Sequence, residues 1–213
     1  MRIFIITPTI GRNSLKRCIS SVKDQIIIQS THIVVGDGPQ NSWVKDYCEN
    51  NQTIYYELET HHGKFGTMAR NYALDRLFKE FNLSKQDYIM FLDDDNELLM
   101  NCLYNISDTI EKNNFPSIII QSILYTGKFN TNYFVMPIND NSIPSNSDWD
   151  NLNGIFRSDI IKNVRFTTVY NHDYILALET FSKVKPEEIC KVKGVNAIHH
   201  VSWDTYDAVY KQL

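Results

Sequence analysis

The sequence predicts an α/β protein with a mixed, mainly parallel central sheet flanked by helices, folded as a single domain over residues 1–213. Strand-like and helix-like segments alternate through the first half of the chain, which implies parallel strands joined by right-handed crossovers. The expected strands are nearly continuous apolar runs, as in strands that are covered on both faces. With 213 residues, of which 43% are hydrophobic, the chain can bury one sizeable core.

The first strand is expected at Arg2–Thr7, where the run is almost wholly apolar until Pro8 interrupts it. Ser14 can cap the helix that follows. The apolar positions of this helix recur at helical spacing, at Leu15, Cys18, Ile19 and Val22. A second strand, His32–Val35, stops at the strong turn signal Gly36–Pro39.

The third strand is expected at Thr53–Glu57, and a polar loop, Glu59–Gly66, follows it. The next segment, Thr67–Phe81, has its leucines and phenylalanines on one helical face, which predicts a long amphipathic helix. A fourth strand, Asp87–Leu92, runs directly into the acidic run Asp93–Asn96.

The second half of the chain is less regular. The pattern predicts strands at Ser117–Ile123 and Tyr133–Met136, a polar loop over Asn139–Trp149, short helices at Ile155–Ile161 and Tyr174–Phe181, and a strand followed by a loop over Val192–Trp203.

Composition argues against several classes of protein. A net charge of −4 disfavours broad nucleic-acid binding, which needs a basic face. No apolar run approaches the roughly 20 residues of a membrane span, and the N-terminus lacks the features of a signal peptide. The 4 cysteines are widely spaced and form no CxxC pair, which indicates reduced thiols. We therefore expect a cytoplasmic protein.

Polar clusters stand at the ends of three predicted strands, at Thr7–Arg12, Gly36–Gly38 and Asp93–Asn96. Ligands of such sheets bind beyond the carboxyl ends of the parallel strands. We therefore expect these three clusters to converge on one site.

The run Asp93, Asp94 and Asp95 follows a buried strand, where mutual repulsion must be offset by a cation or by hydrogen bonds. Mg²⁺ and Mn²⁺ prefer oxygen ligands and often share them with substrate phosphates. Because successive strand residues point to opposite faces, Asp93 and Asp95 are expected on one side and Asp94 on the other. The pattern predicts a metal–diphosphate site, and the alternative is a solvated acidic turn.

A second candidate is the glycine-containing segment His61–Asn71, which enters a helix and carries Lys64 and Arg70. Helix N-termini and cationic side chains stabilise phosphate. The segment has neither the Gly-Lys-Ser/Thr of a phosphate-binding loop nor a dinucleotide fingerprint. The alternative is an ordinary loop before an amphipathic helix.

These motifs resemble, in type and order, those of nucleotide-sugar glycosyltransferases with the GT-A fold, and the best overall likeness is to glycosyltransferase family 2. The segments that carry the resemblance are Ile5–Thr9, Val34–Gly38, Gly66 with Arg70-Asn71, Phe91–Asp95, Gly154–Ser158, Val164–Phe166 and His172–Leu176. The resemblance covers about Arg2–Leu178. Size and composition are also similar to those of glycosyltransferase domains from large DNA viruses.

The resemblance implies a metal-dependent enzyme that moves a hexose or deoxyhexose from a UDP-sugar to a hydroxyl of a glycan or glycoconjugate acceptor, with Mn²⁺ or Mg²⁺ as cofactor. Residues 1–100 would form the nucleotide-binding half and residues 101–213 the acceptor-binding half. The implied donor-binding residues are Thr7, Pro8, Arg12, Asp37, Lys64, Arg70, Asp93 and Asp94.

Individual roles are implied in the same way. Asp37 would accept a hydrogen bond from the uracil ring, and Arg70, together with Lys64, would meet the diphosphate. Asp95 would be the direct metal ligand, with Asp93 beside the ribose and in the metal shell.

Asp173 stands where the family carries a Glu-Asp pair, although His172 replaces the usual glutamate. The resemblance implies that Asp173 is the general base of an inverting displacement and takes the proton from the acceptor hydroxyl. The alternative is an N-cap for the helix Tyr174–Phe181.

His199 is a further candidate metal ligand, because several GT-A enzymes use a histidine from the C-terminal region and imidazole is a common ligand. In a strand His199 and His200 face opposite ways, so only one is expected to reach the site, and a structural histidine is the alternative. Trp149 and Trp203 could stack on a sugar face or belong to the core.

Two other function classes stay open on the sequence. A sugar-phosphate nucleotidyltransferase would share the fold class and the metal, but its glycine-rich basic loop after the first strand is poorly matched by Thr7–Arg12, which has one glycine. A non-catalytic nucleotide-sugar-binding module would not need the intact acidic run.

Overall fold

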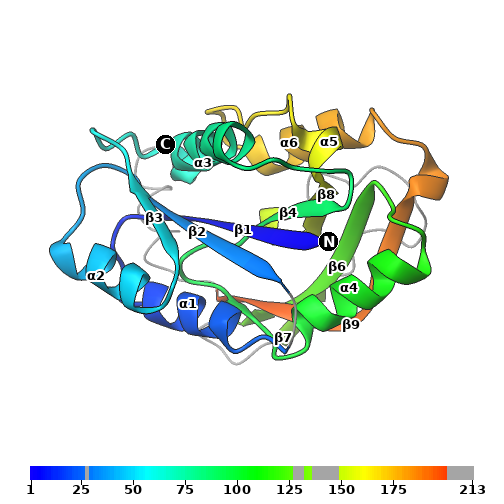
Figure 1. Cartoon of the computed structure of the whole chain (residues 1–213), viewed down its shortest axis with the longest axis horizontal. Helices are drawn as coiled ribbons and strands as arrows, with labels where there is room; N and C mark the ends of the chain where they lie inside the picture. The colour runs from blue at the N-terminus through cyan, green and yellow to red at the C-terminus, as the bar shows by residue number, and fades with distance from the viewer. Residues whose placement is uncertain (27–28, 127–131, 136–148, 201–213) are drawn as a thin grey trace.

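The computed structural model describes residues 1–26, 29–126, 132–135 and 149–200. These residues form three layers, a central sheet with helices on both faces (Figure 1). The sheet has nine strands in the order β3-β2-β1-β4-β8-β6-β9-β5, with β7 paired to β6. The α/β class that the sequence predicts is confirmed.

The bounds of the elements follow the chain. The strands are β1 (Arg2–Thr9), β2 (Ser30–Gly36), β3 (Ile54–Glu57), β4 (Asp87–Phe91), β5 (Glu97–Leu98), β6 (Ile118–Thr126), β7 (Asn132–Val135), β8 (Gly154–Arg157) and β9 (Ile189–His200). The helices are α1 (Leu15–Lys23), α2 (Ser42–Asn50), α3 (Thr67–Glu80), α4 (Cys102–Lys112), α5 (Ser158–Ile161) and α6 (His172–Phe181), with 3-10 turns η1 (Lys64–Gly66), η2 (Asn151–Asn153) and η3 (Pro186–Glu188).

The first half of the chain forms the parallel part of the sheet. β1 pairs in parallel with β2 and with β4, and β2 pairs in parallel with β3. β1 is covered on both faces, since Phe4 and Ile6 belong to one core cluster and Ile3 and Ile5 to the other. This double burial explains why the strand reads as a continuous apolar run rather than as an alternating one.

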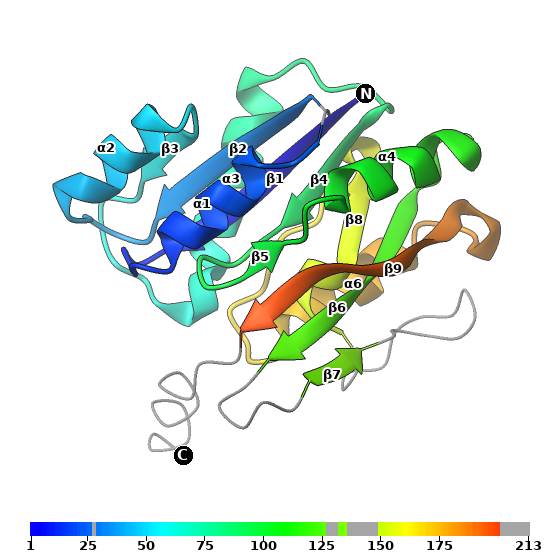
Figure 2. The same ribbon diagram turned by 90° about the horizontal axis from the view of Figure 1, so that it is seen from below.

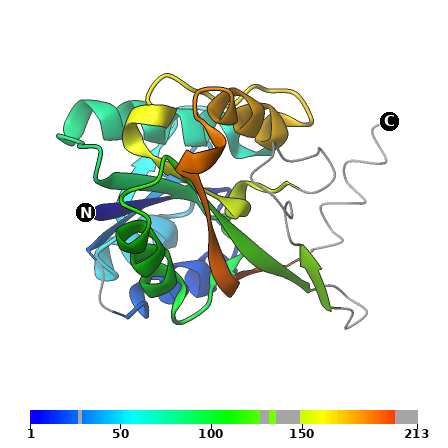
Figure 3. The ribbon, with the colours of Figure 1, turned by 90° about the vertical axis from the view of Figure 1, so that its right-hand side faces the viewer.

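Helices cover both faces of the sheet. Figure 3 shows α3, α5 and α6 on one face of the sheet and α1 and α4 on the other, and Figure 2 shows α1 and α4 lying across the near face. Figure 1 places α2 on the same side as α1. The core on the α3 side includes Leu74, Leu77 and Phe181, and the opposite core includes Cys18, Leu103 and Ile106.

The structure departs from the sequence prediction in several elements. Gly154–Arg157 is the strand β8, antiparallel to β4 and β6, so the helix predicted over Ile155–Ile161 is wrong in its first half and right only for α5. In a short apolar run, periodicity cannot distinguish a strand from a helix. Here the segment is a strand because it pairs with both β4 and β6. The helices α2 and α4 were not predicted.

Other elements match the prediction closely. β6 and β9 fall where strands were expected, β7 begins one residue before the predicted strand, and α6 begins at His172. The predicted loop over Asn139–Trp149 lies outside the described residues except for Trp149. Among the helices that the structure describes, none has the length and apolar character needed to cross a membrane. All four cysteines are free thiols.

The order of the strands fixes where a ligand can bind. The chain builds β2 and β3 on one side of β1 and then returns to place β4 on the other side. In open α/β sheets such a reversal leaves a crevice at the carboxyl ends of the two central strands. Thr9 ends β1, and the acidic run follows β4, so both lie at this point.

Candidate active site

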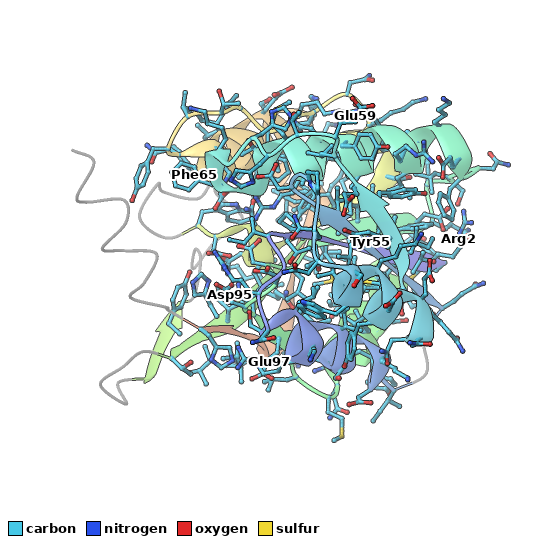
Figure 4. All side chains as sticks on the ribbon, turned by 90° about the vertical axis from the view of Figure 1, so that its left-hand side faces the viewer. Arg2, Tyr55, Glu59, Phe65, Asp95 and Glu97 are labelled. Atoms are coloured by element: carbon cyan, nitrogen blue, oxygen red, sulfur yellow. The ribbon has the colours of Figure 1, made fainter. Side chains whose placement is uncertain are left out.

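A cavity of about 560 Å³ opens at the carboxyl ends of the parallel strands. Its size lies in the range of about 300–1,000 Å³ that is usual for small-molecule sites. It is lined by Pro8, Thr9, Ile10, Arg12, Asp37, His61, Gly63, Phe65, Gly66, Arg70, Asp93, Asp94, Asp95, Tyr125, His199 and His200. The three polar clusters therefore converge as expected. Figure 4 shows Phe65 and Asp95 at this end of the molecule and Arg2, where β1 begins, at the other.

The acidic run does not continue the strand. The backbone turns after Leu92, and the N–H of Asn96 donates to the carbonyl oxygen of Asp93 at 3.0 Å. Arg12 Nη1 bridges two of the carboxylates, at 3.0 Å from Asp94 Oδ1 and 2.8 Å from Asp95 Oδ2. The expectation that Asp94 and Asp95 face opposite sides is wrong, because alternation applies only to extended backbone.

The carboxylates of the run differ in their surroundings. Asp94 is buried and accepts a hydrogen bond from Thr9 Oγ1 at 2.6 Å. Burial raises its pKa to about 6, against the opposing effects of Arg12 and Thr9. Burial and the charge of Asp93 also raise the pKa of Asp95. The acidic run thus concentrates negative charge in the cavity, and the guanidinium of Arg12 partly neutralises it.

Arg70 supplies a second positive charge to the cavity. Its side chain is only 2% exposed, and it forms an ion pair with Asp93, which is 31% exposed. Its Nη1 donates to the carbonyl oxygen of Phe65 at 2.7 Å. Its Nε–H has no hydrogen-bond partner within the described residues. A buried cation that is only partly satisfied is suited to an anionic ligand.

Asp37 fixes the loop that forms one wall of the cavity. Its carboxylate accepts hydrogen bonds from the backbone N–H of His62 at 3.0 Å and of Gly63 at 2.8 Å. The Nδ1 of His61 lies 2.8 Å from the carbonyl oxygen of Asp37. The side chain that the resemblance assigns to the uracil ring is therefore also the anchor of the loop before α3.

The beginning of α3 lies against β1 at the cavity. Gly66 precedes the helix with φ of +73°, and a Cβ there would lie 2.8 Å from the Cβ of Pro8. Only glycine fits both the backbone and the space.

Two predicted donor-binding residues lie elsewhere. Thr7 is buried with its hydroxyl 2.9 Å from His32 Nε2, and Lys64 is exposed and does not line the cavity.

The opposite wall comes from the ends of β6 and β9. His199 lies 3.2 Å from Asp150 Oδ2 through its Nδ1 and stacks on Tyr125, with ring centroids 4.6 Å apart. Burial lowers the pKa of His199, but Asp150 outweighs it and raises the value to about 9. His200 lies 2.8 Å from Glu97 Oε1. Both histidines line the cavity, and their side chains have different partners, Asp150 for His199 and Glu97 for His200.

Asp173 lies beside the cavity rather than on its lining. It stands in the first turn of α6, whose N-cap is Asn171, so the alternative that Asp173 caps this helix is excluded. Its Oδ1 is 2.5 Å from His172 Nε2. Its charge helps to raise the pKa values of Arg70 and Tyr125, both of which line the cavity.

The donor set at this end suits a hard divalent cation, since carboxylate oxygens are the preferred ligands of Mn²⁺ and Mg²⁺. The charge of Asp93 helps to raise the pKa of Asp95, and a bound cation would relieve this repulsion. Within the described residues, no three His, Cys, Asp or Glu side chains are grouped closely enough to hold an ion as they stand. Arg12 would have to leave Asp95 for the ion to bind.

Several cavity residues carry no signal that sequence analysis used. Tyr125 follows the predicted end of its strand, and continuing the apolar run through Leu124 would have included it. Phe65 and His61 lie in the candidate segment His61–Asn71, but sequence analysis assigned neither side chain a role of its own. Trp149 is 8% exposed and packs edge-on against Phe181, so it belongs to the core. Trp203 lies outside the described residues.

Removing the Asp37 carboxylate should release the loop. Each hydrogen bond to a charged group contributes about 1.5–3 kcal/mol, so in Asp37→Ala the backbone amides of His62 and Gly63 should exchange about 10–100 times faster. Residue-resolved hydrogen exchange measures this. Asp46→Ala, at an exposed carboxylate on α2, is the matched control and should leave both rates unchanged. Equal rates in the two variants would contradict the anchoring role.

Comparison with known proteins gives the family. The sequence model of glycosyl transferase family 2 matches residues 4–170. No curated protein sequence matches the chain significantly. Among solved structures, the chain superposes on S. aureus TarS with a TM-score of 0.73 at 15% identity, over 100% of this chain and 39% of that one.

Two further TarS structures are similar. TarS 1-349 in complex with UDP gives a TM-score of 0.73 at 15% identity, over 98% of this chain and 63% of that one. TarS 1-349 in complex with UDP-GlcNAc gives a TM-score of 0.70 at 15% identity, over 95% of this chain and 59% of that one. This chain thus spans less than two thirds of the solved structures, which support its fold. Because the family model matches most of the sequence, the chain belongs to glycosyl transferase family 2 and has the GT-A fold of a glycosyltransferase.

Proposed function

We propose that the protein transfers a hexose or deoxyhexose from a UDP-sugar to a hydroxyl group of a glycan or glycoconjugate. The observation that carries this proposal is the convergence of Asp37, Arg70 and the acidic run on one cavity at the reversal point of the sheet. The TarS complexes with UDP and UDP-GlcNAc support a uridine nucleotide as the leaving group. The free thiols support a reducing compartment such as the cytoplasm.

The donor would lie along the cavity from Asp37 to the acidic run. Pro8 and the loop held by Asp37 would form the base and ribose pocket. Arg70 would meet the diphosphate together with the N-terminus of α3, because a buried guanidinium and unpaired helix N–H groups both favour phosphate. Arg12 is 36% exposed and can turn from Asp95 toward the same charge.

Asp95 and Asp93 would hold Mn²⁺ or Mg²⁺, with His199 as a further ligand. When bound, the ion would neutralise the charge that develops on the departing diphosphate. Asp173 would accept the proton of the acceptor hydroxyl as that oxygen attacks the anomeric carbon. The C–O bond to the diphosphate would break as the new glycosidic bond forms, and the configuration at the anomeric carbon would be inverted.

A thermal-shift experiment tests the donor and the metal together. UDP-GlcNAc at a hundredfold excess over Kd should stabilise the protein by about 2.7 kcal/mol, or about 5–10 °C. The shift should be larger with Mn²⁺ than with EDTA, and Asp95→Ala should lose this difference. Asp75→Ala, at an exposed carboxylate on α3, is the control and should keep it.

Each failure has a distinct meaning. A full Mn²⁺ effect in Asp95→Ala would remove Asp95 from the metal site. No shift with UDP or UDP-GlcNAc would reject the donor. Release of pyrophosphate from UTP and a sugar phosphate would identify a nucleotidyltransferase instead. Binding of UDP-sugar with no transfer or hydrolysis under any metal would identify a binding module.

A further inference from the structure

Two exposed aromatic side chains lie side by side, and one of them lines the cavity. Phe65 is 46% exposed and lines the cavity, and Tyr170 is 68% exposed. Their ring centroids are 6.1 Å apart with an interplanar angle of 78°. Two neighbouring exposed aromatic rings beside a cavity offer a ligand an apolar surface to pack on.

The backbone at Phe65 is held in an unfavourable conformation. Lys64 and Phe65 have φ of +52° and +58°, a region that bulky residues avoid. The hydrogen bond from Arg70 Nη1 to the carbonyl oxygen of Phe65, 2.7 Å long, fixes this conformation. Non-glycine residues held in this region cluster at ligand sites, where surrounding contacts impose the strain. The exposed ring of Phe65 is therefore positioned by the same residue that would bind the diphosphate.

The aromatic pair is connected to the proposed base. The ring of His172 stacks on that of Phe65, with centroids 5.5 Å apart and planes at 16°. The Nε2 of His172 lies 2.5 Å from Asp173 Oδ1. His172 is 6% exposed and contacts both the ring of Phe65 and the carboxylate of Asp173. An acceptor whose hydroxyl reaches Asp173 would have the rest of its body against Phe65 and Tyr170.

We propose that Phe65 and Tyr170 form a stacking platform that selects a pyranose ring as the acceptor, with one ring hydroxyl directed at Asp173. This inference rests on the proposed function. A pyranose offers a face of C–H groups that packs on the electron-rich face of an aromatic ring, while its hydroxyls remain at the edge for hydrogen bonding. A linear polyol has no such rigid face, so the platform favours a cyclic sugar.

Saturation-transfer NMR on the full chain with UDP and Mn²⁺ tests the platform. The probes are the methyl pyranosides of glucose, galactose, mannose, rhamnose and N-acetylglucosamine, with ribitol as the linear comparison. At least one pyranoside should receive saturation at its ring C–H protons, and ribitol should receive much less. Phe65→Ala and Tyr170→Ala should each weaken that pyranoside about tenfold, as expected for the loss of one aromatic contact.

Two variants separate stacking from folding. Phe65→Trp keeps a ring and should retain binding, whereas Phe65→Leu keeps apolar volume and should lose it. Tyr104→Ala, at a tyrosine 55% exposed on α4, is the matched control and should bind as the unmodified protein does. Unfolding midpoints of all variants, measured alongside, identify any that fail to fold.

The outcomes distinguish this inference from the proposed function. UDP binding without any pyranoside binding, equal binding of ribitol, or unchanged affinity in both alanine variants would overturn the platform and leave the donor site intact. Loss of UDP binding in the unmodified protein would instead reject the proposed function.

Discussion

Asp173→Asn is expected to lower kcat by about 10²–10⁴-fold, the usual contribution of a positioned general base. The amide cannot accept the acceptor proton, yet it nearly preserves the shape of the side chain. UDP affinity should therefore stay within about twofold, because the residue lies beside the cavity and not on its lining. Steady-state turnover of UDP-sugar and calorimetric titration of UDP measure the two effects separately.

Asp159→Asn is the matched control for this variant. Asp159 stands in the first turn of α5 and its side chain is 28% exposed, close to the 25% of Asp173. The Asp159→Asn variant should turn over UDP-sugar at the rate of the unmodified protein. An unchanged kcat in Asp173→Asn would remove the residue from the base role. If Asp150→Asn abolished turnover instead, the base would be the carboxylate that pairs with His199. A product that keeps the donor's anomeric configuration would also contradict the mechanism.

Asp93→Ala is expected to destabilise the fold more than any other substitution in the acidic run. It removes the ion-pair partner of Arg70, whose side chain is 2% exposed and would be left as a poorly compensated buried charge. Breaking a fully buried pair costs about 3–5 kcal/mol. Asp93 is itself 31% exposed, so in the variant water can solvate part of the charge of Arg70. We therefore expect the free energy of unfolding to fall by about 2–3 kcal/mol. Urea denaturation measures the free energy of unfolding.

Two comparisons make this prediction specific. Asp95→Ala should cost less than about 1 kcal/mol, since its partner Arg12 is 36% exposed and can be hydrated. Adding Arg70→Met to Asp93→Ala should recover most of the lost stability, because it removes the buried charge. Equal losses for Asp93→Ala and Asp95→Ala, or no recovery in the double variant, would show that the buried pair does not support the fold.

The parallel half of the fold was predictable because its signals are local and repeated. β1 and β4 are apolar runs that end at turn residues, and α3 carries one apolar face. The same logic brought the ends of β1, β2 and β4 together, since parallel strands in adjacent positions share one edge. The location of the site thus followed from strand order rather than from any single motif.

The second half was harder because its elements depend on partners far along the chain. β8 became a strand by filling the gap between β4 and β6. In the first half, α2 was missed because its apolar face buries only Val44 and Cys48, which is too weak a pattern to predict a helix. The resemblance assigned Thr7 to the donor pocket, yet Thr7 is buried inside β1, with its hydroxyl 2.9 Å from His32 Nε2.

The sequence by itself determined the fold class and the end of the sheet where a ligand can bind, because apolar periodicity and strand-end polar residues are encoded within short windows. The family came from the resemblance of its ordered motifs and from the match to the family model. Tertiary structure alone decided how the charges are paired. Arg12 forms ion pairs with Asp94 and Asp95, and Arg70 forms one with Asp93. The ring of Phe65 stacks on that of His172. These contacts join residues 23 to 107 positions apart, and only packing of the whole chain brings such groups into one low-dielectric space where they shift one another's energies.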